Sequence, residues 1–277
     1  MKKETTEIPL NYVTLKTTKS RINKGLLAIP VSLIDIFPKD RNKIHLIDEF
    51  GNEEPKKFTP YSSSSRECRI GGLKNFYDKF KVKDGDELII QLIDDGKFRL
   101  LPEKYFKKQV LNSLSEFEKS ETERIADEKL NIISSLTNTD KTQLLKNEFV
   151  RLSKTSLANR KTRIVAKGVA KESVPYSLRK ILQAIYLGKC QISNFTFIMK
   201  NGKPYFEIHH IDPKIGNHFK NLLVVCPNTH AQFTYAEIEQ TFDKDSWLRK
   251  VKFNNEEYSV YQAIDTLPSF FEKEVHF

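Results

Sequence analysis

The feature that most constrains this chain is a cluster of histidines in its last third. Four of the six histidines, His209, His210, His218 and His230, lie within 22 of the 277 positions. Imidazole can bind a metal ion or transfer a proton near neutral pH, so this density indicates chemistry. The adjacent pair ends a predicted strand, and His230 falls on a predicted helix after a loop.

Adjacent histidines on a strand point to opposite sides, which gives them separate tasks. One ring can hold a metal while the other faces a water molecule. A histidine on the following helix can complete a two-residue clamp that leaves coordination positions open for phosphate and water. Hydrolysis of a phosphodiester needs a deprotonated water and a neutralised leaving oxygen. The pattern therefore predicts a metal-dependent phosphodiesterase centre.

The order and spacing of these residues resemble the HNH, or ββα-metal, nuclease family over roughly residues 174–240. The resemblance implies that His209 and His230 bind the metal and that His210 is the general base. Asn221, nine residues before His230, matches the family's middle asparagine, which ties the loop between strand and helix. The implied cofactor is Mg²⁺, and two neutral imidazoles would also accept Mn²⁺ or another divalent ion.

Two CxxC pairs that bind a structural zinc in many relatives are incomplete here. They read Cys190-Gln191-Ile192-Ser193 and Cys226-Pro227-Asn228-Thr229, and two thiolates cannot close a tetrahedral site, so we expect no structural zinc. A further histidine present in some relatives is Thr234. Packing is expected to hold the module instead, through Phe195, Phe197, Tyr205, Phe206 and Trp247.

Three further polar residues lie close to the histidines. Glu207 alternates with His209 and is expected either beside the metal ligands or on the strand surface. Asp212 precedes Pro213 and is expected to form a turn. His218 has no role in the family, which leaves an exposed loop position or a phosphate contact.

The charge of the chain favours a polyanionic partner. Lys and Arg number 46 against 36 Asp and Glu, a net charge of +10, which favours nucleic acid first and an acidic membrane surface second. No apolar segment has the length of a signal peptide or membrane span, and the three cysteines form no disulfide framework. We expect a cytoplasmic protein with no membrane partner, and no ATP, because a GxxxxGK[ST] loop is absent.

Residues from about 11 to 106 are expected to form a β-rich unit. Its predicted elements are strands at 12–15, 43–47, 87–93 and 97–101, a turn at 94–96 and a helix at 73–80. The segments 16–30, 66–76 and 80–88 resemble the B-three pseudobarrel, the DNA-binding domain of auxin-response factors, which effector domains of some restriction enzymes share.

That resemblance implies two arms that enter the major groove, around Thr17 to Asn23 and around Tyr61 to Arg69. Alternatively, the four serines at 62–65 form a flexible loop in solvent rather than part of the second arm. The residues expected to contact bases are Arg21, Asn23, Arg66 and Arg69, and those expected to contact phosphates are Lys16, Lys19 and Lys24.

The middle of the chain, from about 111 to 157, carries an interrupted apolar stripe among many charges. It predicts helices, with a break and N-cap at Asp140 before a helix that begins near Lys141. The stripe fits either a helical spacer or dimer contacts. Between 154 and 180, eight Lys or Arg stand against one acid, either as a solvated face or as a phosphate-contacting arm. The expected phosphate contacts there are Arg160, Lys161 and Arg163.

Together these features predict a multidomain α+β protein with a B-three-like reader (1–107), a helical basic linker (108–173) and an HNH nuclease (174–277). The most economical function is a Type II restriction endonuclease that cleaves double-stranded DNA to 5′-phosphate ends. A homodimer and a cognate DNA methyltransferase in the same system are expected. Two alternatives stay open: another HNH endonuclease, homing or modification-dependent, and a non-catalytic DNA-binding regulator with a degenerate HNH fold.

Overall fold

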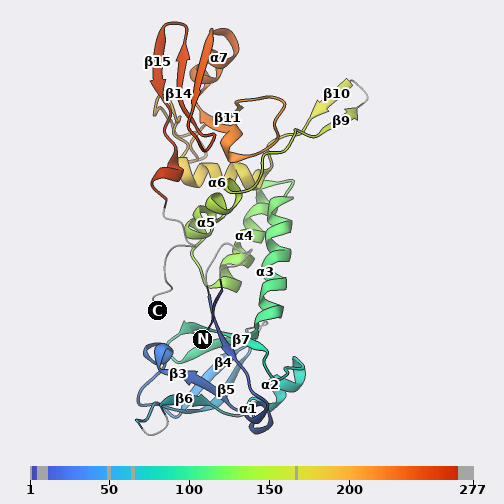
Figure 1. Ribbon diagram of the computed structural model, residues 1–277, viewed down its shortest axis with the longest axis vertical. Coiled ribbons are helices and arrows are strands. Elements are labelled where there is room, and N and C mark those ends of the chain that lie inside the picture. The colour runs from blue at the N-terminus through green and yellow to red at the C-terminus, as the bar shows by residue number, and fades with distance from the viewer. Residues whose placement is uncertain (1, 5–11, 49–50, 64–65, 166–167, 268–277) are drawn as a thin grey trace. The chain divides into compact units, whose positions relative to one another are not determined.

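The computed structural model describes residues 2–4, 12–48, 51–63, 66–165 and 168–267 (Figure 1). It is a mixed α+β structure that divides into two compact units. The first unit holds the described residues up to Ser113 together with 135–138, and the second holds 114–134 and 139–267. Most of the segment 108–173 therefore belongs to the second unit.

The first unit is built on a barrel-like sheet. Its strands follow the order β1-β2-β7-β8-β4-β5-β6-β3, and all neighbours are antiparallel except β4 and β8. The predicted strands, the helix α2 and the turn before β8 are confirmed. The elements are β1 (Lys2–Glu4), β2 (Tyr12–Lys16), α1 (Lys19–Lys24), β3 (Leu27–Pro30), η1 (Val31–Ile36), β4 (Lys43–Ile47), β5 (Glu53–Thr59), β6 (Glu67–Ile70), α2 (Lys74–Lys79), β7 (Glu87–Asp94) and β8 (Lys97–Pro102).

An aromatic stack fills the interior of this sheet. The ring of Phe37 lies 4.4 Å from Phe98 and 5.5 Å from Phe58, measured between centroids. Alternate residues of β6 are buried, as expected for a strand with one face on the core. Helix α1 ends at Gly25, whose φ of 62° suits glycine. This packing fixes the loops at the rim of the sheet.

Four longer helices follow: α3 (Glu103–Glu118), α4 (Glu123–Thr137), α5 (Lys141–Ser153) and α6 (Tyr176–Tyr186). The predicted N-cap is confirmed, since the Asp140 carboxylate accepts hydrogen bonds from the backbone N–H of Thr142 and Gln143 at 2.8 and 3.2 Å. Four members of the predicted apolar stripe are buried within the single chain: Leu114, Phe117, Leu130 and Ile133. Leu111 and Ile125 are half-buried.

The histidines lie on a ββα unit near the top of Figure 1. Strands β11 (Glu207–His210) and β12 (Leu222–Val225) are antiparallel, with His210 opposite Leu222, and helix α7 (Pro227–Tyr235) follows. Every residue of β12 is buried, which makes it the central support of the unit. The remaining elements are β9 (Thr162–Val165), β10 (Gly168–Lys171), η2 (Phe219–Asn221), β13 (Ile238–Phe242), β14 (Leu248–Phe253), β15 (Glu256–Ser259) and η3 (Ala263–Asp265).

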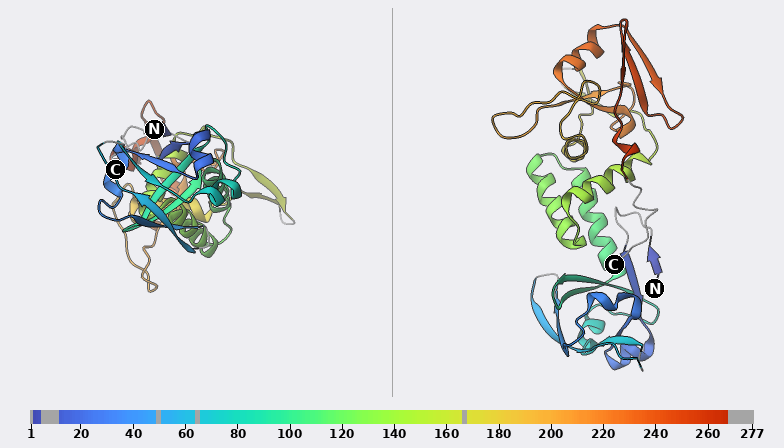
Figure 2. Two further views of the ribbon diagram at one scale, coloured as in Figure 1. Left: turned by 90° about the horizontal axis from the view of Figure 1, so that it is seen from below. Right: turned by 90° about the vertical axis from the view of Figure 1, so that its left-hand side faces the viewer.

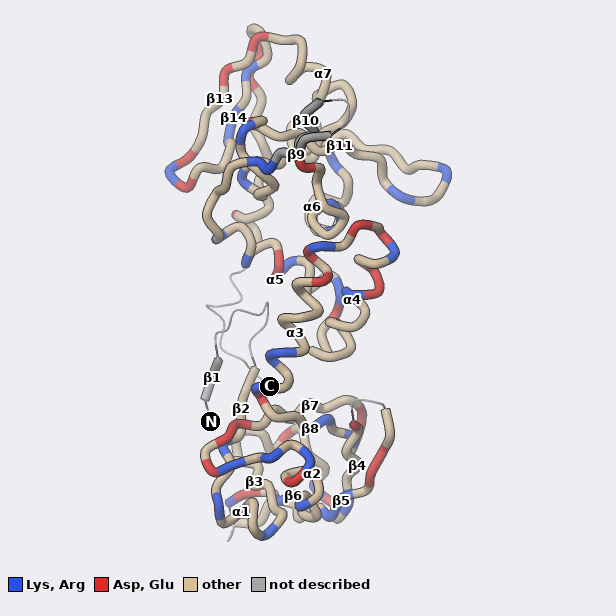
Figure 3. Tube along the Cα trace, turned by 90° about the vertical axis from the view of Figure 1, so that its right-hand side faces the viewer, with Lys and Arg blue, Asp and Glu red and all other residues tan. Residues whose placement is uncertain are grey.

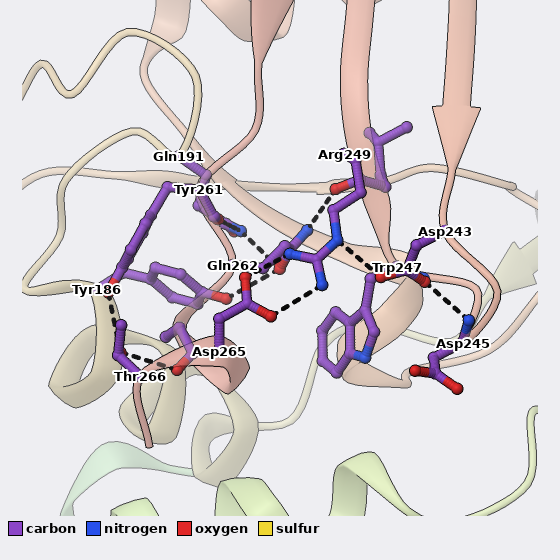
Figure 4. Close-up of polar contacts among 12 residues, drawn as sticks. Tyr186, Gln191, Asp243, Asp245, Trp247, Arg249, Tyr261, Gln262, Asp265 and Thr266 are labelled. Atoms are coloured by element: carbon purple, nitrogen blue, oxygen red, sulfur yellow. Dashed lines mark hydrogen bonds and ion pairs between the residues drawn. The ribbon is translucent and has the colours of Figure 1, made fainter. Parts of the chain in front are cut away.

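A polar network closes the second unit at the end of α6 (Figure 4). The Arg249 guanidinium donates to Asp243 at 2.7 Å and to Asp265 at 2.8 Å. Gln191 accepts a hydrogen bond from the backbone N–H of Val224 at 2.7 Å and donates to the Tyr261 carbonyl at 2.9 Å. These bonds join β12, β14 and the chain after β15 into one support for the histidines.

The expected aromatic core of this module was partly wrong. Phe206 and Trp247 are buried, but Phe195 and Phe197 are 53% and 45% exposed. The reason is local: both lie on an irregular hairpin between α6 and β11, where their side chains are reached by solvent. In the part of the chain that the structure describes, no helix has both the length and the apolar character needed to cross a bilayer.

Candidate active site

The fold brings the two predicted metal ligands together. His209, at the end of β11, stacks on Phe233 of α7 with ring centroids 4.1 Å apart and an angle of 18°. Its ring centroid lies 5.3 Å from that of His230, one turn earlier on α7. Two imidazoles that share an ion at a metal–nitrogen distance of ~2.1 Å in tetrahedral geometry have ring centres about 5 Å apart. The spacing therefore fits one shared divalent ion.

The protonation state of His209 also fits metal binding. Burial, followed by the electrostatic effect of the neighbouring His230 and His210, lowers the pKa of His209 to about 4. The ring is therefore neutral near pH 7, as a ligand must be. Among the described residues, no group of three or more His, Cys, Asp or Glu side chains could hold a metal ion. Water and phosphate would supply the other ligands of an ion held by two histidines.

Glu207, on β11 two residues before His209, orients the His230 ring on α7. Its carboxylate is hydrogen-bonded to His230 Nδ1 and accepts a second hydrogen bond from the Tyr205 hydroxyl at 2.8 Å. The hydrogen bond with His230, which has the largest effect, and the one with Tyr205 both lower the pKa of Glu207. Because the carboxylate can only accept, Nδ1 of His230 donates and Nε2 keeps the lone pair. This leaves Nε2 as the metal-binding atom, with a carboxylate behind the ring as in many metal sites.

His210 has a partner that the sequence did not reveal. Its Nε2 lies 3.0 Å from Oδ1 of Asn217, and Nδ2 of Asn217 donates to the Ser173 carbonyl at 2.9 Å. A carbonyl only accepts, so it fixes the direction of the Asn217 amide and turns Oδ1 toward His210. In the neutral ring Nε2 must then carry the hydrogen and Nδ1 the lone pair. Asn217 thus fixes the tautomer of His210 and leaves the basic lone pair on Nδ1.

Asn221 ties the loop between β11 and β12. Its Oδ1 accepts from the Asp212 N–H at 2.8 Å, and its Nδ2 donates to the carbonyls of Asp212, Ile215 and Gly216 at 3.1, 3.0 and 3.2 Å. Asp212 forms the expected turn by accepting from the Lys214 N–H at 2.8 Å. The side chain therefore holds the loop in place, and any further part in catalysis stays a prediction.

The expectation of an exposed or phosphate-contacting His218 was wrong. This side chain is buried, with Nδ1 accepting from the Lys220 N–H and Nε2 donating to the Thr155 carbonyl, both at 3.1 Å. Burial lowers its pKa. His218 therefore caps η2 and joins the loop to the segment after α5.

The two incomplete cysteine pairs meet at one corner of the second unit, where Cys190, Cys226 and Thr229 are buried and Ser193 is exposed. Thr229 Oγ1 lies 3.3 Å from Cys226 Sγ and 3.5 Å from Cys190 Sγ, and Ser193 Oγ lies 3.6 Å from Cys226 Sγ. Burial raises the pKa of the Cys190 thiol, but hydrogen bonds from Ser193 and Thr229 outweigh it and bring the pKa to about 7. Hydrogen-bond contacts thus connect Cys190, Ser193, Cys226 and Thr229, the first and last residues of the two incomplete pairs.

The residues predicted to read DNA lie in the first unit, around a groove of about 700 Å³ lined by Lys16, Thr17, Thr18, Arg21, Arg66 and Glu67. The carboxylate of Glu67 bonds Arg21 at 3.1 Å and Arg69 at 2.8 Å, so it holds two of the predicted base-contacting side chains. The remaining predicted contacts are exposed on α1 and beside it: Lys16, Lys19, Asn23 and Lys24. Ser64 and Ser65 of the second predicted arm lie outside the described residues.

The basic segment before α6 runs beside the loop of the histidine site. The N–H of Arg160 donates to the Lys214 carbonyl, and the N–H of Gly216 donates to the Ala158 carbonyl, both at 2.8 Å. The Arg160 guanidinium binds the Glu172 carbonyl at 2.7 and 3.1 Å, which gives it a structural partner. Lys161 is exposed, and Arg163 lies on β9.

The second unit therefore collects every residue predicted for catalysis, while the predicted base contacts belong to the first. Asn217 is the residue that sequence reasoning missed, because an asparagine in a loop carries no spacing signal. The sequence matches no known family model, and a search of curated proteins likewise gives no match.

Proposed function

We propose that this protein is a metal-dependent DNA endonuclease of the HNH type. The observation that carries the proposal is that the two adjacent histidines of β11 have different partners. His209 faces His230 at a distance that suits one shared ion, and the neighbouring His210 is held in the tautomer of a base by Asn217. A structural pair of histidines would need neither arrangement.

The chain's own residues account for the proton transfer. His210 takes a proton from the attacking water through Nδ1, while its Nε2–H bond to Asn217 stabilises the charge that develops on the ring. The water oxygen forms the new bond to phosphorus as the bond to the 3′ oxygen breaks. The 3′ oxygen takes a proton from a solvent water and His210 returns its proton to solvent, which leaves a 5′-phosphate and a 3′-hydroxyl. A bound Mg²⁺ or Mn²⁺ would supply charge neutralisation at the phosphate and leaving oxygen. His209 and His230 would hold it, with Glu207 fixing the His230 ring.

The proposed substrate is double-stranded DNA. The net charge of +10 favours a polyanion, and the groove of the first unit presents Arg21 and Arg66, side chains suited to base edges. A sequence-reading unit joined to a nuclease favours a Type II restriction enzyme. We propose that it acts as a homodimer, because one chain has one such site, and beside a cognate methyltransferase. Concerted double-strand breaks by a monomer would contradict the dimer.

The direct test is incubation of the purified protein with unmethylated and with methylated phage and plasmid DNA in Mg²⁺, Mn²⁺ or EDTA. Discrete fragments that need the metal and carry 5′-phosphates are expected. Fragments only from methylated DNA would move the assignment to a modification-dependent enzyme. Intact DNA under every metal, with binding retained in a gel shift, would leave only a DNA-binding regulator.

A further inference from the structure

An irregular hairpin, residues 194–205, projects from the second unit between α6 and β11; we call it the aromatic arm. Backbone bonds shape it: Met199 donates to Lys203 at 2.8 Å, Gly202 to Met199 at 2.9 Å and Tyr205 to Phe197 at 2.9 Å. At its base Pro204 packs on Gly188, where a Cβ would clash with the proline ring. The aromatic arm is therefore a shaped projection, visible in Figure 2 (right) and Figure 3.

The aromatic arm exposes three large apolar side chains that lie close together in the sequence. Phe195, Phe197 and Ile198 are 53%, 45% and 63% exposed. The Phe197 ring stacks on Tyr205 with centroids 5.2 Å apart and planes 16° from parallel, and Phe195 lies 6.3 Å from Phe197. Contiguous exposed apolar side chains of this kind mark a binding surface.

This surface is continuous with the proposed active site. The Tyr205 hydroxyl donates to Glu207 Oε1 at 2.8 Å, and the same carboxylate is bonded to Nδ1 of His230. One hydrogen-bonded residue therefore separates the stacked rings from a proposed metal ligand. Tyr205, at the base of the aromatic arm, therefore contacts the residue that orients His230.

The charge of this part of the chain identifies its partner. Residues 187–206 contain three lysines and no acidic residue, and in Figure 3 the arm shows blue segments and no red. Lys203 is paired with Glu123 at 2.6 Å, whereas Lys200 is exposed. Flat rings flanked by positive charge suit bases and sugars joined by phosphates. An acidic protein surface would meet the charge but not the ring stack.

On this basis, and resting on the proposed nuclease function, we propose that the aromatic arm stacks against bases or sugars of the DNA strand beside the phosphate that is cut. Phe195 and Phe197 provide the stacking faces, and Lys200 contacts the backbone. The aromatic arm would hold the strand in place while the histidines act on it.

The test compares the DNA affinity of the wild type with Phe195→Ala/Phe197→Ala, by fluorescence anisotropy on a labelled duplex in metal-free buffer. The double variant should bind about five- to 100-fold more weakly. The slope of log affinity against log salt should stay unchanged, because neutral rings release no counterions. Phe242→Ala is the matched control, since Phe242 is also 45% exposed in this unit, and it should bind as the wild type does.

If the double variant does not fold, a second variant still tests the proposal. In Phe195→Trp, DNA should protect the new indole from iodide quenching, while Trp247 is already buried. Wild-type affinity in the folded double variant, or unchanged quenching with DNA bound, would overturn the aromatic-arm proposal and leave the nuclease proposal intact. Loss of a dimer without loss of DNA affinity would assign the arm to a second copy of the chain. Failure of the wild type to bind any DNA would instead refute the proposed function.

Discussion

Replacement of Asn217 by alanine removes the partner of the proposed base without touching a proposed metal ligand. The bond from His210 Nε2 to Asn217 Oδ1, 3.0 Å long, becomes a charged hydrogen bond once His210 takes its proton. Bonds to charged groups contribute about 1.5–3 kcal/mol, and a tenfold change in rate corresponds to about 1.4 kcal/mol. The expected loss in kcat is therefore about 10- to 150-fold, with little change in DNA affinity.

Single-turnover cleavage with excess protein measures this loss apart from product release. Asn217→Asp keeps an acceptor for His210 and should recover part of the rate. Ser173→Ala is the control, because it retains the backbone carbonyl that orients Asn217. Full activity of Asn217→Ala, or equal losses in all three variants, would refute the assigned tautomer. A thermal melt separates these results from a general loss of fold.

Three further predictions test other parts of the site. Glu207→Ala should weaken Mn²⁺ binding about 10- to 100-fold in calorimetry, whereas the exposed Glu237→Ala should not; equal affinities would remove Glu207 as the support of His230. The double variant Ser193→Cys/Thr229→Cys should bind one zinc ion and have a higher melting temperature. Tetrahedral zinc ligands lie roughly 3.8 Å apart, and Thr229 Oγ1 lies 3.3 Å from Cys226 Sγ and 3.5 Å from Cys190 Sγ. A double variant that binds no zinc would contradict this geometry. Arg21→Ala or Arg66→Ala should weaken specific binding by about 1–3 kcal/mol in a competition gel shift, and unchanged site preference in both would remove the first unit as the reader.

The sequence predicted the local elements well wherever one periodicity dominated. The strands at 43–47 and 87–93 and the helix that begins at Lys141 were anticipated because β-branched alternation and an Asp cap are local signals. The resemblance to the HNH family implied that His209 and His230 meet, and the structure places their ring centroids 5.3 Å apart.

Other features depended on contacts that no local signal records. Phe195 and Phe197 were assigned to the core by hydrophobicity alone, but the hairpin that carries them projects outward. The sequence favours an exposed loop position or a phosphate contact for His218, but Thr155, distant in sequence, supplies a buried partner. Asn217 became recognisable only when its amide was found between His210 and Ser173. Burial and tautomer are properties of the packed chain, so a pattern of residue types could not reveal them.

The central claim is that His210 is the base of a DNA-cleaving site. Its most direct test is to compare wild type and His210→Ala on the same unmethylated DNA in Mg²⁺ or Mn²⁺, with a gel shift run in parallel. We predict discrete fragments from the wild type, none from the variant, and nearly equal DNA affinity. Cleavage by His210→Ala at the wild-type rate, or DNA binding lost along with cleavage, would contradict the account.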